Sequence, residues 1–265
     1  MKSGGAKNKK ILSLLLIGAY LILNIWMFQD IMHRETIVSK NANVLVMGTN
    51  ATFKPFEYKD GDKVVGFDVD LAEEIAKSLG AELKIEDMSF DGLLPALESG
   101  QIDLAVAGMS VTEDRAKNAF FSDSYYVASQ QIVLRSDSSI RNKYELVNKT
   151  IGVQLGTTGD LMARQIKGAK VVQFPAAPNV LQELTTGRID AAILDNAPAA
   201  QYVAAFSNLK ILDLPLSRES YAIAIKKGNQ KLLDQVNQVI SEMKEDGRMR
   251  KILMKHFGTE KGQLY

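Results

Sequence analysis

Residues 94–105 read LPALESGQIDLA, and the pattern returns at residues 181–192 as LQELTTGRIDAA. The two stretches share two leucines, a glycine, an Ile-Asp pair and an alanine at the same six positions. Leucines at this spacing share a helix face, glycine ends helices, and the apolar residues that follow suit a buried strand. Each copy is therefore predicted to be a helix, a glycine cap and a return strand. The repetition predicts two lobes of similar plan rather than one long sheet.

Around the repeat, short apolar runs alternate with amphipathic stretches, which predicts an α/β fold with mostly parallel sheets flanked by helices. We expect strands at residues 44–48, 83–86, 104–107, 151–154, 171–174, 191–194 and 221–225. We expect helices at residues 69–79 (capped by Asp68), 93–99, 112–118, 160–167, 179–186, 197–206 and in a tail over 230–257.

Composition excludes several classes of protein. The 265 residues contain 32 basic and 31 acidic side chains, so there is no electrostatic case for nucleic acid. The chain has no cysteine, which excludes disulfides, thiol catalysis, thiolate metal sites and lipid attachment at cysteine. We expect neither a cofactor nor a metal ion. The acidic pairs Asp68/Asp70 and Glu73/Glu74 are interpreted as a helix cap and a solvated helix face.

The N-terminal segment predicts contact with a membrane. Four lysines within residues 1–10 precede residues 11–28, which carry no charge. Eighteen residues approach the length that spans a bilayer, and no small-residue cleavage site follows. We expect an uncleaved anchor, with a removed signal sequence as the alternative. Residues 1–10 are then a cytoplasmic tail, residues 29–43 a neck, and the rest lies outside, in the periplasm or at the cell surface.

Polar residues follow the return strand of each repeat copy, where ligands bind in open α/β sheets. Gly108 and Ser110 come after the first strand, and Thr112 is placed to cap a helix containing Arg115. A guanidinium there can hold a carboxylate, or it can be a solvated surface group. Asp195 follows the second strand, where its carboxylate can receive an ammonium group or cap the next helix.

Two further features lie at predicted strand ends. Residues 156–159 read GTTG and open a helix, so the amides of Thr157 and Thr158 are suited to an anion. Phe53 and Phe90 each follow a predicted strand. Aromatic residues at such positions usually belong to the core, but two of them beside a cleft can sandwich a ligand side chain.

Five blocks together resemble the polar-amino-acid solute-binding proteins of ABC transporters, which are two-lobed periplasmic binding proteins of type II. The blocks are residues 49–57, 66–72, 110–115, 121–126 and 187–195, and the resemblance covers about residues 43–258. It implies a first lobe from residues 44–129 and 222–258 and a second lobe from residues 130–221. Two hinge strands are implied near residues 127–131 and 217–222.

The resemblance also implies roles for the residues at the strand ends. Arg115 holds the α-carboxylate of the ligand, helped by the amides of Ser110 and Thr158. Asp195 takes the α-ammonium, helped by the carbonyl of Gly108 and the hydroxyl of Ser110.

The resemblance places the ligand side chain between Phe53 and Phe90. Asn50 stands where many relatives that bind basic side chains carry aspartate, and Gln154 occupies a position that varies. Since a buried guanidinium needs a paired acid and no carboxylate is evident in this part of the sequence, a neutral ligand such as glutamine is favoured over arginine.

The predicted function is therefore the extracytoplasmic substrate-binding component of an amino-acid ABC transporter. It would be a monomer that closes about its hinge and meets a permease with its ATPase. One alternative is a lyase on the same fold, of the cyclohexadienyl-dehydratase type, which needs a general acid or base in the cleft. His33 and His256 are not near strand ends, and Glu57 is interpreted as a surface charge and Asp91 as a cap. The other alternative, a ligand-sensing domain, needs cytoplasmic signalling sequence, and only ten residues precede the apolar run.

Overall fold

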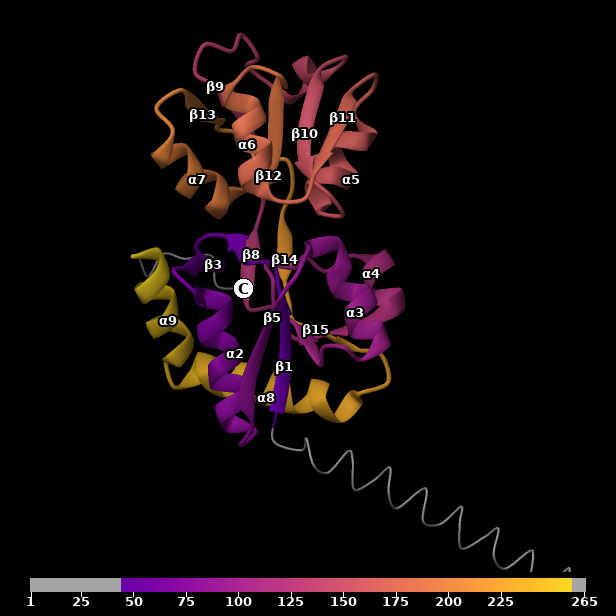
Figure 1. Ribbon diagram of the computed structural model, residues 1–265, viewed down its shortest axis with the longest axis vertical. Helices are drawn as coiled ribbons and strands as arrows, with labels where there is room; N and C mark the ends of the chain where they lie inside the picture. Colours follow the sequence, from indigo (N-terminus) through magenta and orange to yellow (C-terminus); the bar gives the residue numbers. More distant parts are fainter. Residues whose placement is uncertain (1–43, 259–265) are drawn as a thin grey trace, which may run out of the picture. The chain divides into compact units, whose positions relative to one another are not determined.

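The computed structural model describes residues 44–258, which form two lobes, each built on a five-stranded sheet with helices of its own (Figure 1). The first sheet has the order β5-β1-β6-β15-β7, and the second has the order β11-β10-β12-β9-β13. This confirms the two-lobed α/β fold expected from the repeat. In each sheet parallel and antiparallel pairs are mixed, since β15 runs antiparallel to β6 and β9 antiparallel to β12.

The first lobe takes its elements from both ends of the described chain. Its strands are β1 (Val44–Thr49), β5 (Glu82–Asp87), β6 (Leu104–Ala105), β7 (Ala119–Phe121) and β15 (Ala224–Lys226), with a hairpin sheet of β2 (Thr52–Phe53), β3 (Glu57–Asp60) and β4 (Lys63–Val65). Its helices are α2 (Phe67–Ser78), α3 (Leu93–Ser99) after the 3-10 turn η1 (Phe90–Gly92), α4 (Glu113–Asn118), α8 (Gln230–Glu245) and α9 (Arg248–Phe257).

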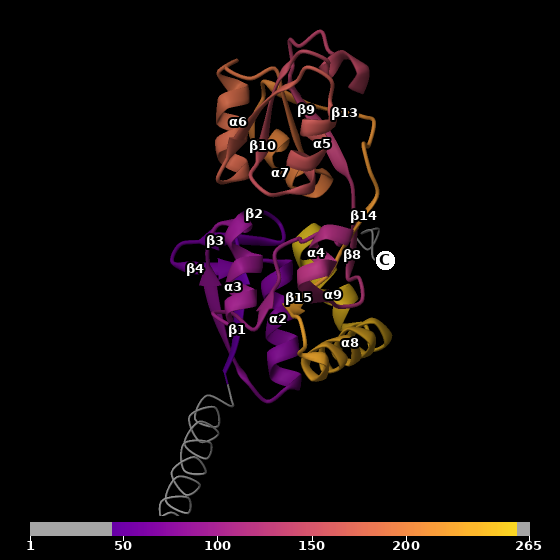
Figure 2. The ribbon, with the colours of Figure 1, turned by 90° about the vertical axis from the view of Figure 1, so that its right-hand side faces the viewer.

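The second lobe is one continuous stretch of chain. Its strands are β9 (Gln130–Arg135), β10 (Thr150–Gln154), β11 (Lys170–Phe174), β12 (Ala191–Asp195) and β13 (Leu209–Leu212). Its helices are the 3-10 turn η2 (Lys143–Leu146), α5 (Thr158–Gln165), α6 (Ala177–Thr185) and α7 (Asn196–Ala205). Two antiparallel strands, β8 (Tyr126–Ala128) and β14 (Glu219–Tyr221), join the lobes (Figure 2).

Both copies of the repeat form the predicted helix, glycine and strand. Gly100 caps α3 with φ 79°, and Gly187 follows α6 with φ 77°, a backbone conformation that favours glycine. The two repeated aspartates also make equivalent hydrogen bonds. Asp103 accepts a hydrogen bond of 2.8 Å from the amide of Val46, and Asp190 one of 2.8 Å from the amide of Thr150. In each lobe the repeat thus ties its return strand to the start of the neighbouring parallel strand.

Each sheet buries both of its faces, as expected of sheets covered by helices. In the first lobe, α2, α8 and α9 pack on one face and α3 packs on the other. In the second lobe, α6 and α7 cover one face, and α5 with Leu146 of η2 covers the other. Two rigid, fully packed platforms therefore carry the loops at the strand ends.

Several local expectations are corrected by the structure. Asp68 does not cap α2, because the helix begins at Phe67 after Gly66 and the Asp68 side chain is buried. The expected strand at 221–225 is two strands, β14 and β15, since the chain passes there from the hinge into the first sheet. The helical tail divides at Gly247, which has φ 85°. The hairpin of β2, β3 and β4 was not expected.

No helix among residues 44–258 is long and apolar enough to cross a membrane. The predicted anchor at 11–28, the tail at 1–10, the neck at 29–43 and His33 lie outside the described residues. The lobe boundaries at 129/130 and 221/222 stay predictions.

Candidate ligand-binding site

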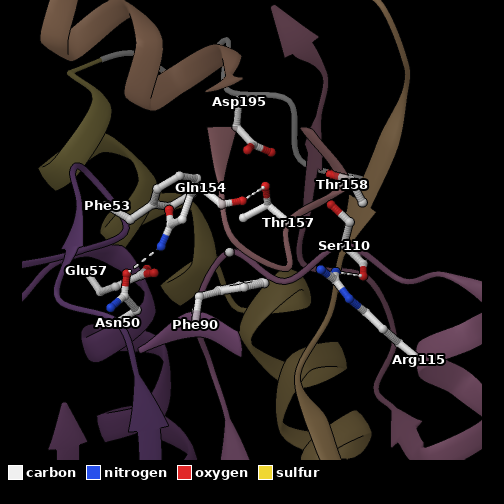
Figure 3. A pocket seen from close by; sticks show the side chains of 12 residues that line it. Asn50, Phe53, Glu57, Phe90, Ser110, Arg115, Gln154, Thr157, Thr158 and Asp195 are labelled. Carbon is white, nitrogen blue, oxygen red and sulfur yellow. Dashed lines mark hydrogen bonds between the residues drawn. The ribbon is translucent and has the colours of Figure 1, made fainter. Parts of the chain in front are cut away.

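A cavity at the ends of the strands brings together all ten residues that the sequence singled out (Figure 3). The empty space within it, including open solvent at its mouth, is about 300 Å³. Its lining consists of Asn50, Phe53, Glu57, Phe90, Ala107, Gly108, Ser110, Arg115, Gln154, Thr157, Thr158 and Asp195. Glu57 and Ala107 are the two members that the sequence did not assign to a site.

Arg115 is the buried cation of the cavity. Thr112 caps α4 by accepting a hydrogen bond of 3.2 Å from the amide of Arg115, as predicted. The guanidinium donates 2.6 Å to the carbonyl oxygen of Ser110 and 3.0 Å to that of Gly156, and its centre lies 5.2 Å from the centroid of the Phe90 ring. Burial lowers the pKa of Arg115, but a guanidinium stays charged. With only carbonyl oxygens as hydrogen-bond partners, its charge is available to an anion.

Asp195 ends β12 and is buried on the side of the cavity opposite Arg115 (Figure 3). Its carboxylate does not cap α7; it accepts a hydrogen bond of 2.6 Å from the hydroxyl of Tyr221 in the hinge strand β14. Burial, followed by the charge of Glu219, raises the pKa of Asp195 to about 6. A carboxylate held in this way gains from a cationic partner that replaces the lost hydration.

The start of α5 supplies the polar wall from the second lobe. Thr157 caps the helix through a hydrogen bond of 3.3 Å from the amide of Asp160. The hydroxyl of Thr158 donates 2.7 Å to Glu219 and accepts 3.0 Å from Gln130. Glu219 lies on β14 and also accepts a hydrogen bond from the hydroxyl of Ser110. The carboxylate of Glu219, which sequence reasoning missed, therefore holds hydroxyls from both lobes.

Asn50 and Gln154 form a second bridge between the lobes. The amide nitrogen of Gln154 donates 2.9 Å to the side-chain oxygen of Asn50, which also accepts 2.8 Å from Thr52. The amide nitrogen of Asn50 donates 2.8 Å to the carbonyl of Met88. The side-chain oxygen of Asn50 therefore has two donors within the protein, and Asn50 lies on the same side of the cavity as Glu57 (Figure 3).

Phe53 reaches the cavity because Gly108 leaves room for it. Gly108 has φ 51°, and a Cβ atom there would come within 2.8 Å of the Phe53 ring. The amide of Gly108 donates 2.7 Å to the buried Asp68. Gly108 is therefore required both for its backbone conformation and for the close approach of Phe53. In Figure 3, Phe90 lies between Glu57 at one end of the cavity and Arg115 at the other.

The prediction that Glu57 is a surface charge is wrong. Its side chain is 1% exposed and lines the cavity. Neither carboxyl oxygen has a hydrogen-bond donor. Burial, and then the charge of Asp68, raises its pKa well above the ordinary value. A neutral ligand was favoured because no carboxylate was evident to pair with a ligand guanidinium. The buried carboxyl of Glu57 removes that reason. The only sequence signal was the position of Glu57 directly after Phe53 and Phe56 within a block of the resemblance.

Three charged side chains thus line the cavity: one cation, Arg115, and two acids, Asp195 and Glu57. Within residues 44–258 no cluster of three or more histidine or acidic side chains is arranged to hold a metal ion. His256 is hydrogen-bonded to Asp70 at 2.8 Å and does not line the cavity.

Residues 45–259 match the family described as bacterial extracellular solute-binding proteins, family 3. Among curated proteins, the arginine-binding extracellular protein ArtP of Bacillus subtilis is 39% identical over 223 residues, which cover 82% of this chain and 87% of ArtP.

Solved structures give the same picture. The arginine-bound form of ArgBP from T. maritima is 47% identical with a TM-score of 0.75, covering 79% of this chain and 99% of that one. An ancestral arginine-binding protein bound to glutamine is 44% identical with a TM-score of 0.76, covering 82% of this chain and 99% of that one. The family match over residues 45–259 spans both lobes and the positions of all the cavity residues.

Proposed function

This chain belongs to family 3 of the bacterial extracellular solute-binding proteins, and on that premise we propose that its ligand is an amino acid with a cationic side chain, arginine first. Binding an amino acid is its function. The proposal concerns which amino acid, how the residues of the cavity hold it, and what receives it.

The α-groups of the ligand are held by Arg115 on α4 and by Asp195 at the end of β12. Arg115 pairs with the α-carboxylate, assisted by the amides of Ser110 and Thr158, and Asp195 pairs with the α-ammonium. Support comes from the burial of both side chains, which are 8% and 6% exposed, and from their opposite charges in one cavity. Buried charges need partners, and a zwitterion offers one to each.

The single observation that carries the choice of a cationic ligand is the buried carboxyl of Glu57. After the zwitterion has neutralised Arg115 and Asp195, the carboxyl of Glu57 remains without a hydrogen-bond donor. A guanidinium offers five donors in a planar fork that matches a carboxylate. Phe53 and Phe90 flank the aliphatic part of the ligand between the two ends.

Closure about β8 and β14 assembles the site, because its groups come from both lobes. Arg115 and Glu57 belong to the first lobe, Asp195 and Thr158 to the second, and the hinge residue Glu219 holds hydroxyls of both. A ligand that touches both lobes favours the closed arrangement by its differential affinity. The closed form is what an ABC permease with its ATPase would receive.

The wider setting is proposed from the sequence. Residues 11–28 tether the protein to the outer face of the membrane, or are removed as a signal, and the protein acts as a monomer without catalysis. The named relatives are binding proteins, which supports a role without catalysis.

Calorimetric titration of the full chain, purified in detergent, with arginine, lysine, citrulline and glutamine tests the choice of ligand. Arginine is expected to bind most tightly. Citrulline has the same shape but a neutral ureido group, and we expect it to bind at least about tenfold more weakly, since a buried charge pair is worth more than about 1.4 kcal/mol. Citrulline or glutamine binding as tightly as arginine would show that Glu57 does not select a cation.

A further inference from the structure

Glu57 and Asp68 form a pair of buried acids at the wall of the cavity. Glu57 begins β3 and Asp68 lies in the first turn of α2; their side chains are 1% and 0% exposed. The chain brings them together because the amide of Asp68 donates 2.9 Å to the carbonyl of Phe56, the residue before Glu57.

The two carboxyls are incompletely hydrogen-bonded as long as both are ionised. Oδ2 of Asp68 accepts 2.7 Å from the amide of Gly108 and 2.9 Å from the hydroxyl of Tyr125. Oδ1 of Asp68 and both oxygens of Glu57 have no donor. If one proton lies on Glu57, its hydroxyl can donate to the unpartnered Oδ1 of Asp68, because the bond from the amide of Asp68 to the carbonyl of Phe56 brings the two residues together. Such unmade bonds are costly inside a protein, so sharing one proton is favoured.

The groups that face Glu57 and Asp68 also favour a proton shared between the two carboxyls. Burial and the neighbouring acids Asp68 and Asp195 raise the pKa of Glu57 well above its ordinary value, and burial raises that of Asp68 to about 6. The other facing titratable groups are the hydroxyls of Tyr125 and of Tyr202 on α7, which carry no positive charge. Arg115 lines the same cavity as Glu57, but no basic side chain of residues 44–258 is hydrogen-bonded to either acid.

We propose that the Glu57–Asp68 pair keeps one shared proton in the ligand-free protein and that the cationic side chain of the ligand displaces it into solvent. This rests on the proposed function. One O–H bond of the pair breaks, its proton goes to buffer, and the N–H groups of the ligand side chain donate to Glu57 in its place. A neutral ligand releases no proton, because its side chain brings no positive charge to the pair and the shared proton stays between Glu57 and Asp68.

The site is then a proton-coupled selector. Affinity for a cationic amino acid rises with pH by up to tenfold per unit wherever the free pair holds the proton and the complex does not. Affinity for the neutral ligand with the same shape lacks this dependence. Asp195 also ionises as it takes the α-ammonium, but it does so for both ligands, so the difference between them isolates the pair.

The test is calorimetry of the full chain at pH 7 with arginine and with citrulline, each in buffers of different ionisation enthalpy. The slope of binding enthalpy against buffer enthalpy counts the protons released. We expect arginine to release about one proton more than citrulline, and the ratio of their affinities to increase between pH 5.5 and pH 7.5. In Glu57→Gln the excess proton should disappear, together with the preference for arginine.

Tight arginine binding with the same proton count as citrulline would overturn the displacement while leaving the proposed ligand intact. Failure of arginine to bind the wild-type protein would overturn both proposals. Because the comparison of the two ligands uses the wild-type chain alone, it holds even if the Glu57→Gln variant does not fold.

Discussion

Arg115 and Gly156 lie in different lobes, yet Nη2 of Arg115 donates a hydrogen bond of 3.0 Å to the carbonyl oxygen of Gly156. The side chain proposed to hold the ligand carboxylate is therefore itself a contact between the lobes. Ligand binding is therefore coupled to closure, because the Arg115 guanidinium can bind the ligand carboxylate and the Gly156 carbonyl of the second lobe at the same time.

Replacing Arg115 by lysine is expected to weaken arginine binding by at least about thirtyfold. The planar guanidinium of Arg115 can bond the carbonyls of Ser110 and Gly156 and an anion at the same time, whereas the ammonium of lysine cannot. Disrupting a buried charge pair costs about 2–5 kcal/mol. Arg141→Lys, a change at an exposed position, is the control and should bind normally. Calorimetry compares the two, and equal affinities would remove Arg115 from the site.

Asp195 makes the stability of the ligand-free protein depend on pH. Its pKa is raised to about 6, so the folded protein holds this proton more tightly than the unfolded chain does. The contribution favours folding below about pH 4 and is lost as pH rises through 6, on the order of 3 kcal/mol for two pKa units.

Asp195→Asn should abolish that loss. The variant is expected to gain stability relative to wild type between pH 4.5 and pH 7.5 in urea denaturation without ligand, while binding arginine far more weakly. A stability difference that stays constant with pH would contradict the assignment.

Gly108→Ala should destabilise the protein more than Gly80→Ala. Both glycines have positive φ, 51° and 64°, so both variants carry the strain of a left-handed residue, about 1–2 kcal/mol. Only at Gly108 does a Cβ meet the Phe53 ring, at 2.8 Å, whereas at Gly80 nothing lies within 4 Å. Thermal denaturation should rank the variants in this order, and ligand affinity should fall only for Gly108→Ala because Phe53 is displaced.

Glu219→Gln should weaken ligand binding although Glu219 does not line the cavity. One oxygen of Glu219 accepts from the hydroxyls of Ser110 and Thr158, and the other accepts 2.7 Å from Ser217. An amide keeps only one acceptor oxygen, so at least one hydroxyl loses its partner, which costs about 1–3 kcal/mol and hence about fivefold or more in affinity.

The control for this change is Glu183→Gln, whose carboxylate pairs with Arg188 at the surface. Such exposed pairs contribute little. Equal arginine affinity in the two variants would show that the hinge carboxylate does not organise the site.

Local patterns predicted the elements whose signals are local. Helix α3 has its predicted bounds, since its apolar spacing and the glycine that ends it lie within eight residues. The polar stretch that leads to Arg115 and the strand end that carries Asp195 followed from the repeat, because both copies place polar residues after a buried strand. That these residues line one cavity could only be expected from the family resemblance.

Glu57 could not be predicted because its burial is made by residues outside its own strand. The stretch Glu57–Asp60 is polar and resembles a surface strand. It is covered because Gly66, with φ 139°, lets the start of α2 approach Phe56 so closely that a Cβ would come within 2.0 Å of its carbonyl oxygen. Glu219 was missed for a similar reason, since its hydroxyl partners lie 109 and 61 residues away.

The most direct measurement is a crystal structure of the protein with arginine bound. The proposed site predicts the α-carboxylate within hydrogen-bond distance of the Arg115 guanidinium, the α-ammonium beside Asp195, and the ligand guanidinium against Glu57. An arginine bound in the reverse direction, with its guanidinium on Asp195, or bound outside this cavity, would contradict it.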